Sequence, residues 1–114
     1  EHFPMTETNM NPIAILNDAF RTTLIGGTVV LTAGVQALNE ADQRAVIQSV
    51  QSFSDFSEDN DPYQEHDCAV LVVNNKRYLF KIDYYDLNLE YGSENPADPS
   101  LTKQVLTVML ADEY

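Results

Sequence analysis

A predicted β-hairpin over residues 68–84 constrains the fold of this chain more than any other stretch. The run CAVLVV, residues 68–73, is apolar throughout and is typical of a buried strand. Asn74 and Asn75 follow it, and asparagine tolerates the positive φ angles that a two-residue hairpin turn requires. The return run, residues 77–84, alternates large apolar and other side chains, as a half-buried strand does. The fold is therefore expected to contain the antiparallel pair 68–73/77–84.

The residues before the hairpin predict two helices separated by a short strand. Asn11 is the expected N-cap of the first helix, and the glycine pair 26–27 is expected to end it. Residues 28–32, TVVLT, predict the strand. Asn39 is the expected N-cap of the second helix, because acidic residues follow it in the first turn and apolar residues then recur at helical spacing.

The residues after the hairpin predict a third strand and a last helix. Leu87, Leu89 and Tyr91 continue the two-residue period of a strand. Asp98 and Pro99 are expected to start a helix that continues almost to the end of the sequence. The order α-β-α-β-β-β-α predicts an α+β fold in which a small antiparallel sheet packs with three helices. We expect a monomer, or a homodimer that pairs through the third strand at a sheet edge.

Residues 11–114 are expected to form one α+β domain, because a chain of 114 residues fits a single domain. Residues 1–10 are expected to be disordered or to derive from cloning. The sequence has no run of about 18 apolar residues, so no membrane span is expected. Cys68 is the only cysteine, so an internal disulfide cannot form, and a cytoplasmic location is expected because that compartment is reducing.

The net charge of −12, from 18 acidic and 6 basic residues, limits the partners that this protein can bind. Contacts to nucleic acids and anionic membranes depend on clustered Lys and Arg, and the only adjacent basic pair is Lys76-Arg77. Direct binding to nucleic acid or to a membrane is therefore not expected. A basic protein is the expected partner, and so strong an acidity also suits imitation of a nucleic-acid backbone.

The stretch DNDPYQEHD, residues 59–67, is the main candidate for a functional site. Asp and Asn side chains commonly build turns, so one interpretation is a structural loop in which His66 anchors the chain to the sheet. A second interpretation is a binding face for a basic protein. The candidate residues of that face are Asp59, Asn60, Asp61, Glu65, His66, Tyr85 and Asp86.

A divalent metal site is a third interpretation of the same stretch. Its candidate ligands are Asp59, Asp61, Glu65 and His66. An EF-hand loop requires glycine at its sixth position and glutamate at its twelfth. A loop that starts at Asp55 has Asn60 and His66 there, which does not fit. The sequence therefore predicts no cofactor, and a divalent ion held by carboxylates remains the alternative.

A metal-dependent or acid–base hydrolase is the alternative function. Its candidate catalytic residues are His66, Asp67, Lys81 and Asp83. Histidine exchanges protons near neutral pH, and the strand period places Lys81 and Asp83 on one face. The hydrolase hypothesis requires these side chains to converge in one cleft. No nucleophile elbow, Walker loop or dinucleotide fingerprint supports it, so a noncatalytic binding protein is the preferred interpretation.

Five stretches of the chain occur in the same order in a bacterial family. They are LNDAFR, GGTVVLTAGV, FSEDNDPYQEHD, KIDYYD and PADPSLTKQVLTVMLADEY. From about Leu16 to Tyr114 the chain resembles the family named domain of unknown function 3768. This resemblance implies a small single-domain protein of proteobacteria, of a family with many members on plasmids and other mobile elements, and it implies no activity. Members have an aromatic residue and a glycine where this chain has Cys68 and Ala69, which weakens any special role for Cys68.

Overall fold

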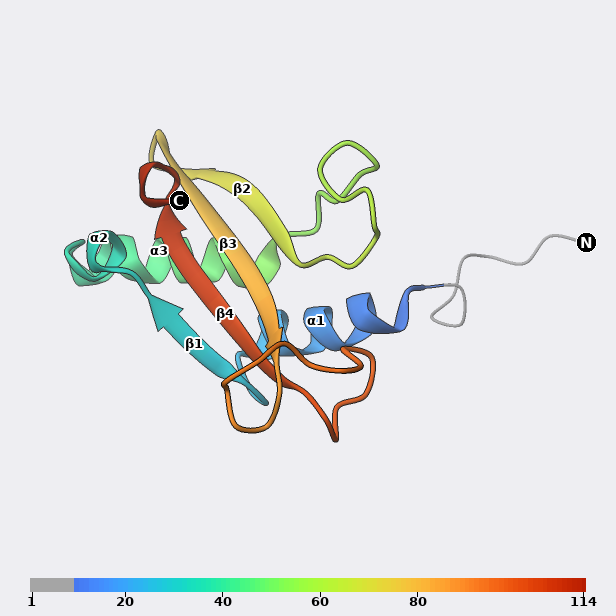
Figure 1. Ribbon diagram of the computed structural model, residues 1–114. Helices are drawn as coiled ribbons and strands as arrows, with labels where there is room; N and C mark the ends of the chain where they lie inside the picture. The colour runs from blue at the N-terminus through green and yellow to red at the C-terminus, as the bar shows by residue number, and fades with distance from the viewer. Residues whose placement is uncertain (1–9) are drawn as a thin grey trace, which may run out of the picture.

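The computed structural model describes residues 10–114 and contains a four-stranded sheet with the strand order β1-β4-β3-β2 (Figure 1). The helices are α1 (Pro12–Thr23), α2 (Ala33–Gln36), α3 (Glu40–Ser52) and a short 3-10 helix, η2 (Ala111–Glu113). The strands are β1 (Thr28–Leu31), β2 (Cys68–Val73), β3 (Lys76–Tyr85) and β4 (Lys103–Leu110). The predicted α+β class is confirmed. The sheet is mixed and not purely antiparallel, because β1 runs parallel to β4.

The predicted hairpin is confirmed and supplies two neighbouring strands of the sheet. β2 and β3 pair antiparallel along the whole of β2, and Val73 lies opposite Lys76 at the turn. Asn74 and Asn75 have φ angles of 51° and 65°. These left-handed values are the ones that a two-residue hairpin turn requires and that asparagine adopts at small cost.

The predicted last helix is wrong, because residues 103–110 form β4, a central strand. β4 pairs antiparallel with β3 and parallel with β1. Leu106 and Val108 are buried on one face of β4, and Met109 on the other face is buried too. Apolar residues on both faces hide the two-residue period, so the run imitates helical spacing. Asp98, the expected helix cap, instead closes a turn by accepting the backbone N–H of Ser100 at 2.9 Å.

The third strand predicted at residues 87–91 is wrong as well, because this segment is a turn. The carboxylate of Asp86 accepts the backbone N–H groups of Asn88 and Glu90 at 3.1 Å and 3.0 Å. Leu89 has a left-handed φ of 59°, which a strand residue does not adopt. The strand through which a homodimer was expected to pair is therefore absent at residues 87–91.

The two helix caps predicted before the hairpin, Asn11 and Asn39, are confirmed. The side-chain oxygen of Asn11 accepts the N–H of Ile13 at 2.9 Å, and that of Asn39 accepts the N–H of Asp42 at 2.8 Å. Each bond satisfies a backbone donor that a helix start leaves without a partner. The structure adds one element that the sequence pattern does not predict, the single turn α2.

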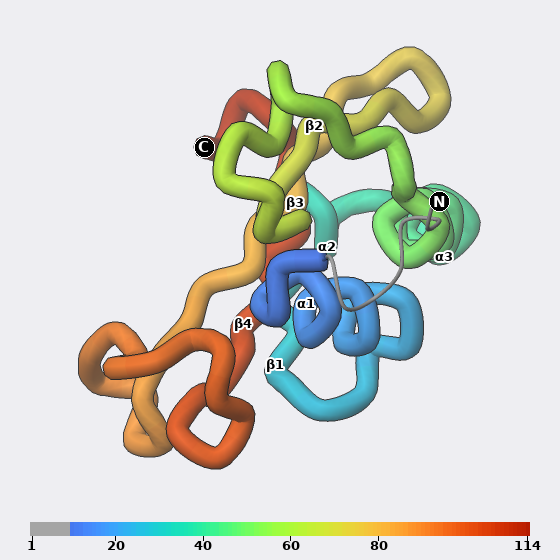
Figure 2. Tube along the Cα trace, turned by 90° about the vertical axis from the view of Figure 1, so that its right-hand side faces the viewer, coloured from blue at the N-terminus to red at the C-terminus, as the bar shows by residue number. Residues whose placement is uncertain are grey.

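Helices α1 and α3 pack on one face of the sheet, here called the covered face (Figure 2). The buried core between them and the sheet includes Phe20, Val46, Val50, Phe80, Leu106 and Val108. The opposite face is called the open face, and Val70 and Val72 on it are 46% and 66% exposed. The site residues are therefore divided between a side that the helices cover and a side that faces solvent.

Gly27 lies where α1, β1 and β4 approach one another, and an alanine there is expected to destabilise the fold. A Cβ atom on Gly27 would lie 2.7 Å from the Gln104 carbonyl oxygen and 2.7 Å from Cζ of Phe20. Overpacking of this kind costs about 1–3 kcal/mol of unfolding free energy. The control is Gly92→Ala, since the nearest atom to its added Cβ is 3.9 Å away. Urea unfolding should therefore show a clear loss for Gly27→Ala and a near-native midpoint for Gly92→Ala, and equal midpoints would contradict the close approach.

The segment expected to lie outside the domain, residues 1–10, falls outside the described residues except for Met10. A single domain over residues 11–114 stays a prediction. Among the helices of residues 10–114, none has the length and apolar character needed to cross a membrane.

Candidate functional site

The acidic loop, residues 55–67, joins α3 to β2, and its first part is a turn built by Asn60. The Asn60 amide donates to the Asp55 carbonyl at 2.8 Å, and its oxygen accepts the N–H of Ser57 at 2.7 Å. Asp59 is exposed at the tip of this turn. Asn60 therefore holds the loop together, and Asp59 is left free to meet solvent or a partner.

Asp61 is a buried carboxylate that organises the second turn of the acidic loop. Its side chain is 4% exposed, and it accepts the backbone N–H groups of Glu65 and His66 at 3.2 Å. Gln64 and His66 both have positive φ angles, 58° and 56°. Two left-handed non-glycine residues carry a conformational cost, and the bonds from Asp61 help to stabilise this turn.

His66 fastens the acidic loop to helix α1. Its Nδ1 lies 2.9 Å from a carboxylate oxygen of Asp18, and its Nε2 lies 3.6 Å from the Asp61 carboxylate. The imidazole stacks on the ring of Phe56, with centroids 4.1 Å apart and planes 3° apart. His66 thus anchors the loop to a helix and not to the sheet. Because both ring nitrogens face carboxylates of this chain, the arrangement suits a tether better than proton transfer to a substrate.

Arg21 is the residue beneath the loop that sequence reasoning missed. It is 2% exposed, and its guanidinium donates to the carbonyls of Val50 and Phe53, each at 2.8 Å. These carbonyls lie at the C-terminal end of α3, where helix acceptors lack partners. Arg21 also pairs with Asp18 at 3.0 Å, and its guanidinium carbon lies 5.4 Å from the ring centre of Phe56. One buried cation therefore joins α1, the end of α3 and the base of the loop.

Glu65, two residues before the end of the acidic loop, belongs to a second hydrogen-bond network, which joins the loop to the sheet. Tyr84 donates its hydroxyl to the Glu65 carboxylate at 2.7 Å. The Asn17 amide donates to the Glu65 carbonyl and to the Tyr84 hydroxyl, each at 2.9 Å, and Gln104 donates to the Asn17 oxygen at 2.7 Å. Burial, together with the hydrogen bond to Glu65, raises the pKa of Tyr84 far above its usual value. Tyr84 is therefore a permanent donor at any physiological pH.

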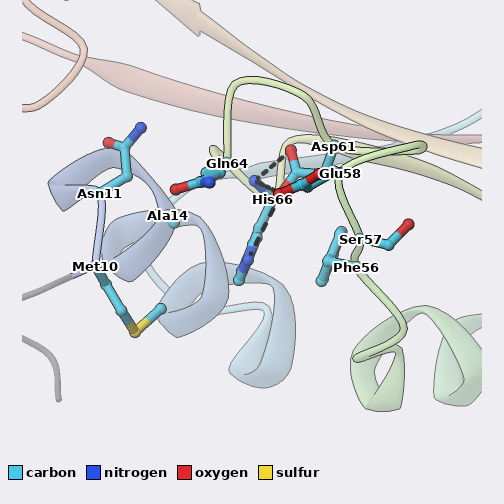
Figure 3. A pocket seen from close by; sticks show the side chains of 9 residues that line it. All are labelled: Met10, Asn11, Ala14, Phe56, Ser57, Glu58, Asp61, Gln64 and His66. Atoms are coloured by element: carbon cyan, nitrogen blue, oxygen red, sulfur yellow. Dashed lines mark hydrogen bonds and ion pairs between the residues drawn. The ribbon is translucent and has the colours of Figure 1, made fainter. Parts of the chain in front are cut away.

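A pocket of about 330 Å³ lies between the start of α1 and the acidic loop (Figure 3). Its apolar lining includes Met10, Ala14 and Phe56, and Glu58 and Asp61 supply its carboxylates. Figure 3 shows Met10, Asn11 and Ala14, from the start of α1 and the residues before it, on one side of the view. Phe56, Ser57, Glu58 and Asp61 of the loop lie on the other side, with Gln64 and His66 between them. Apolar surface beside carboxylates suits the long stem and charged head of a lysine or arginine side chain.

The residues proposed for hydrolase chemistry do not share one cleft. Asp67, Lys81 and Asp83 border a groove of about 500 Å³ on the open face, whereas His66 lines the pocket between α1 and the loop. The Lys81 ammonium pairs with Asp83 at 2.7 Å, and this hydrogen bond raises the pKa of Lys81. Cys68 borders the same groove, and burial together with Asp67 raises the pKa of its thiol, which disfavours a reactive thiolate. His66 and the other three residues thus border two different pockets, whereas the hydrolase hypothesis requires all four side chains in one cleft.

Tyr85 and Asp86, the last two residues proposed for the binding face, lie apart from the acidic loop. Tyr85 is the last residue of β3, and Asp86 is the first residue of the long connection to β4. Figures 1 and 2 both show that connection away from the acidic loop. The carboxylate of Asp86 is occupied by its own turn. Tyr85 and Asp86 therefore do not form one continuous surface with the acidic loop.

The four candidate metal ligands do not form a shared ligand set. Asp61 faces His66, the Glu65 carboxylate bonds to Tyr84, and Asp59 is exposed at the turn. Within residues 10–114, no three His, Cys, Asp or Glu side chains are grouped so that they could hold a metal ion. The carboxylates of the loop are arranged chiefly as hydrogen-bond acceptors for the loop itself.

Residues 31–113 match the model of a family described as protein of unknown function (DUF3768). The matched range covers α2, α3, the acidic loop and strands β2 to β4. Comparison with curated proteins and with solved structures gives no match. The geometry of the acidic loop and the charge of the chain are therefore the features that bear on function.

Proposed function

The chain belongs to the family described as protein of unknown function (DUF3768), and we propose that it is a noncatalytic binding module that engages a basic protein through its acidic loop. In the specific form of this proposal, the partner is a nucleic-acid-binding protein, and the chain inhibits it by imitating nucleic-acid charge. The net charge of −12 supports this form, because phosphate-binding surfaces attract a dense array of acids.

The observation that carries the proposal is the division of roles within the acidic loop. Asn60, Asp61 and His66 are committed to internal hydrogen bonds, so the loop has a defined shape before any partner arrives. Asp55, Glu58, Asp59 and Tyr63 are exposed, and Tyr63 is 80% exposed. A preorganised loop that presents acids and an aromatic side chain loses less entropy on binding than a flexible one.

The pocket beside the loop supports a basic side chain as the central contact. Met10 and Phe56 offer apolar surface, and the exposed Glu58 offers a carboxylate at its border. A partner arginine that enters this space can lay its stem against the apolar wall and direct its guanidinium to Glu58.

Charge reversal at Glu58 and Asp59 is expected to abolish binding without unfolding the protein. Both side chains are exposed, so two lysines there should leave the fold intact while they repel a basic partner. Titration of an arginine-rich peptide, followed by calorimetry, should show at least a tenfold weaker Kd for Glu58→Lys/Asp59→Lys. Asp61 is unsuitable for this test because it is buried and holds the loop.

The matched control is Glu90→Lys/Glu94→Lys on the connection between β3 and β4. These acids are also exposed, and the change in net charge is the same. A control that binds the peptide nearly as well as the native chain would assign binding to the acidic loop. Equal weakening by both pairs would show that only the total charge matters and would remove the acidic loop from the proposal.

A further inference from the structure

The free edge of β2 is a second surface, on which the proposed function does not depend. β2 is the outermost strand on its side of the sheet and has β3 as its only neighbour in the sheet. Its sequence, CAVLVV, contains no charge, proline or glycine, and Val70 and Val72 are 46% and 66% exposed. Proteins usually protect an edge strand with charges, prolines or bulges, because an unprotected edge pairs with other strands. β2 has none of these features.

The hairpin geometry determines which backbone groups face the free edge. A two-residue turn makes the residues that flank it, Val73 and Lys76, a hydrogen-bonded pair, and such pairs recur at every second residue. The bond from the Ile82 N–H to the Asp67 carbonyl, at 2.7 Å, continues this series. The remaining residues turn their N–H and C=O groups outward. They are Cys68, Val70 and Val72.

Charge complementarity indicates what pairs with this edge. Asp67 and the acidic loop precede β2, whereas Lys76 and Arg77 follow it directly after the turn. An antiparallel copy of the same strand therefore brings the acidic end of one β2 to the basic end of the other, twice. Two of the 6 basic residues of the chain, Lys76 and Arg77, lie at the turn where this edge ends, and they lower the repulsion between two acidic copies there.

We infer that two copies of this chain form a homodimer by antiparallel pairing of β2 with β2, with the twofold axis at Val70. Residues with outward groups pair with residues of the same kind, and one antiparallel register pairs all three of them: Val70 lies opposite the partner's Val70, and Cys68 lies opposite the partner's Val72. The two sheets then form one continuous sheet with closed twofold symmetry. Pairing of one short strand gives a small interface, so the dimer is reversible and depends on concentration.

Sedimentation velocity over a concentration series tests the homodimer. The native chain should approach twice its 12.8 kDa mass as concentration rises. Val72→Pro should remain a monomer, because it removes an outward N–H without touching the β2–β3 ladder. Val70→Lys should also shift the equilibrium to the monomer by placing like charges opposite one another at the axis. Val30→Lys is the matched control, since Val30 is 41% exposed on the other edge strand, and it should dimerise like the native chain.

Cross-linking tests the register. In Val72→Cys, the new thiol faces the partner's Cys68, and mild oxidation should give a covalent dimer on a non-reducing gel. Residues 68 and 72 of one strand are about 13 Å apart, which is too far for a disulfide within the chain. Adding Cys68→Ser to Val72→Cys should abolish the cross-link, because in this register the two new cysteines do not meet.

Three results would overturn the inference. They are a native chain that stays monomeric at its highest soluble concentration, a dimer that survives both Val72→Pro and Val70→Lys, and an undiminished cross-link after Cys68→Ser. The native dimer and the peptide titration are separate measurements. Loss of the dimer leaves the acidic loop proposal unaffected, and failure of peptide binding leaves the β2 edge unaffected.

Discussion

Replacing Arg21 with alanine is expected to lower the free energy of unfolding by about 3–5 kcal/mol, the largest single effect that we expect in this fold. Arg21 is 2% exposed and donates to carbonyls of Val50 and Phe53 at the end of α3, each at 2.8 Å. Alanine removes the Arg21 donor from the Phe53 carbonyl, and it leaves the Val50 carbonyl with only the longer bond from the Phe53 N–H, at 3.3 Å. It also leaves a cavity in place of a long side chain. The substitution also removes the ion pair between Arg21 and Asp18, which lie one turn apart on α1.

Two control variants separate these contributions. Arg21→Lys keeps the positive charge, but one ammonium cannot reproduce the forked contacts to carbonyls and carboxylate, so an intermediate loss is expected. Arg44→Ala removes an exposed cation that lies 4.0 Å from Glu40, and surface pairs of this kind contribute at most about 1 kcal/mol. Urea unfolding of the three variants should therefore rank them Arg21→Ala, Arg21→Lys and Arg44→Ala, in order of decreasing loss. A loss for Arg21→Ala no larger than for Arg44→Ala would refute the structural role of the buried cation.

The hairpin could be predicted from sequence because its signals are local. Asn74 and Asn75 determine the turn, and the alternation in β3 determines which side chains are buried. β4 could not be predicted in the same way. Its neighbours in the sheet, β1 and β3, come from distant parts of the chain, and the apolar residues on both of its faces are compatible with a helix as well as a strand.

In the acidic loop, too, local contacts could be predicted from the sequence and contacts to distant residues could not. That Asn60 and Asp61 would build turns follows from their side-chain chemistry, and the structure shows both doing so. The partner of His66 could not be inferred, because Asp18 lies 48 positions earlier in the sequence. Sequence reasoning therefore located the loop correctly but attached His66 to the wrong element.

The sequence of α1 does contain a pattern that indicates a buried hydrogen-bond network. Asn17 and Arg21 are four residues apart, and Phe20 lies beside them on the same side of the helix. A polar pair at core-facing positions predicts a buried hydrogen-bond network, because buried polar groups need partners. In the structure Asn17 and Arg21 are 0% and 2% exposed, and they bind the two ends of the acidic loop region. The conformation of the loop is thus stabilised by side chains of α1 as well as by its own residues.

Asn17→Ala is expected to cost about 2–3 kcal/mol of unfolding free energy, because one buried amide satisfies three different partners. Asn17 donates to the Glu65 carbonyl and to the Tyr84 hydroxyl, and it accepts from Gln104 at 2.7 Å. Tyr84 keeps its bond to the Glu65 carboxylate in the variant, so the main loss falls on the Gln104 amide and the Glu65 carbonyl. Urea unfolding measures this loss, and a cost below about 0.5 kcal/mol would contradict the role of Asn17 in joining loop and sheet.

Asn17→Asp provides a sharper form of the same test, because it adds a titratable group at an almost unchanged shape. The new carboxyl would be buried close to Glu65, so its pKa in the folded state should be raised above its value in the unfolded chain. A group of this kind binds more protons when folded, so its stabilising effect is present at low pH and is lost as pH rises through the folded-state pKa. Relative to Asn17→Ala, the Asn17→Asp variant should therefore be more stable near pH 4 than near pH 7. A difference between the two variants that does not change with pH would show that position 17 is solvated, and the buried network that joins α1, the acidic loop and the sheet would then have to be abandoned.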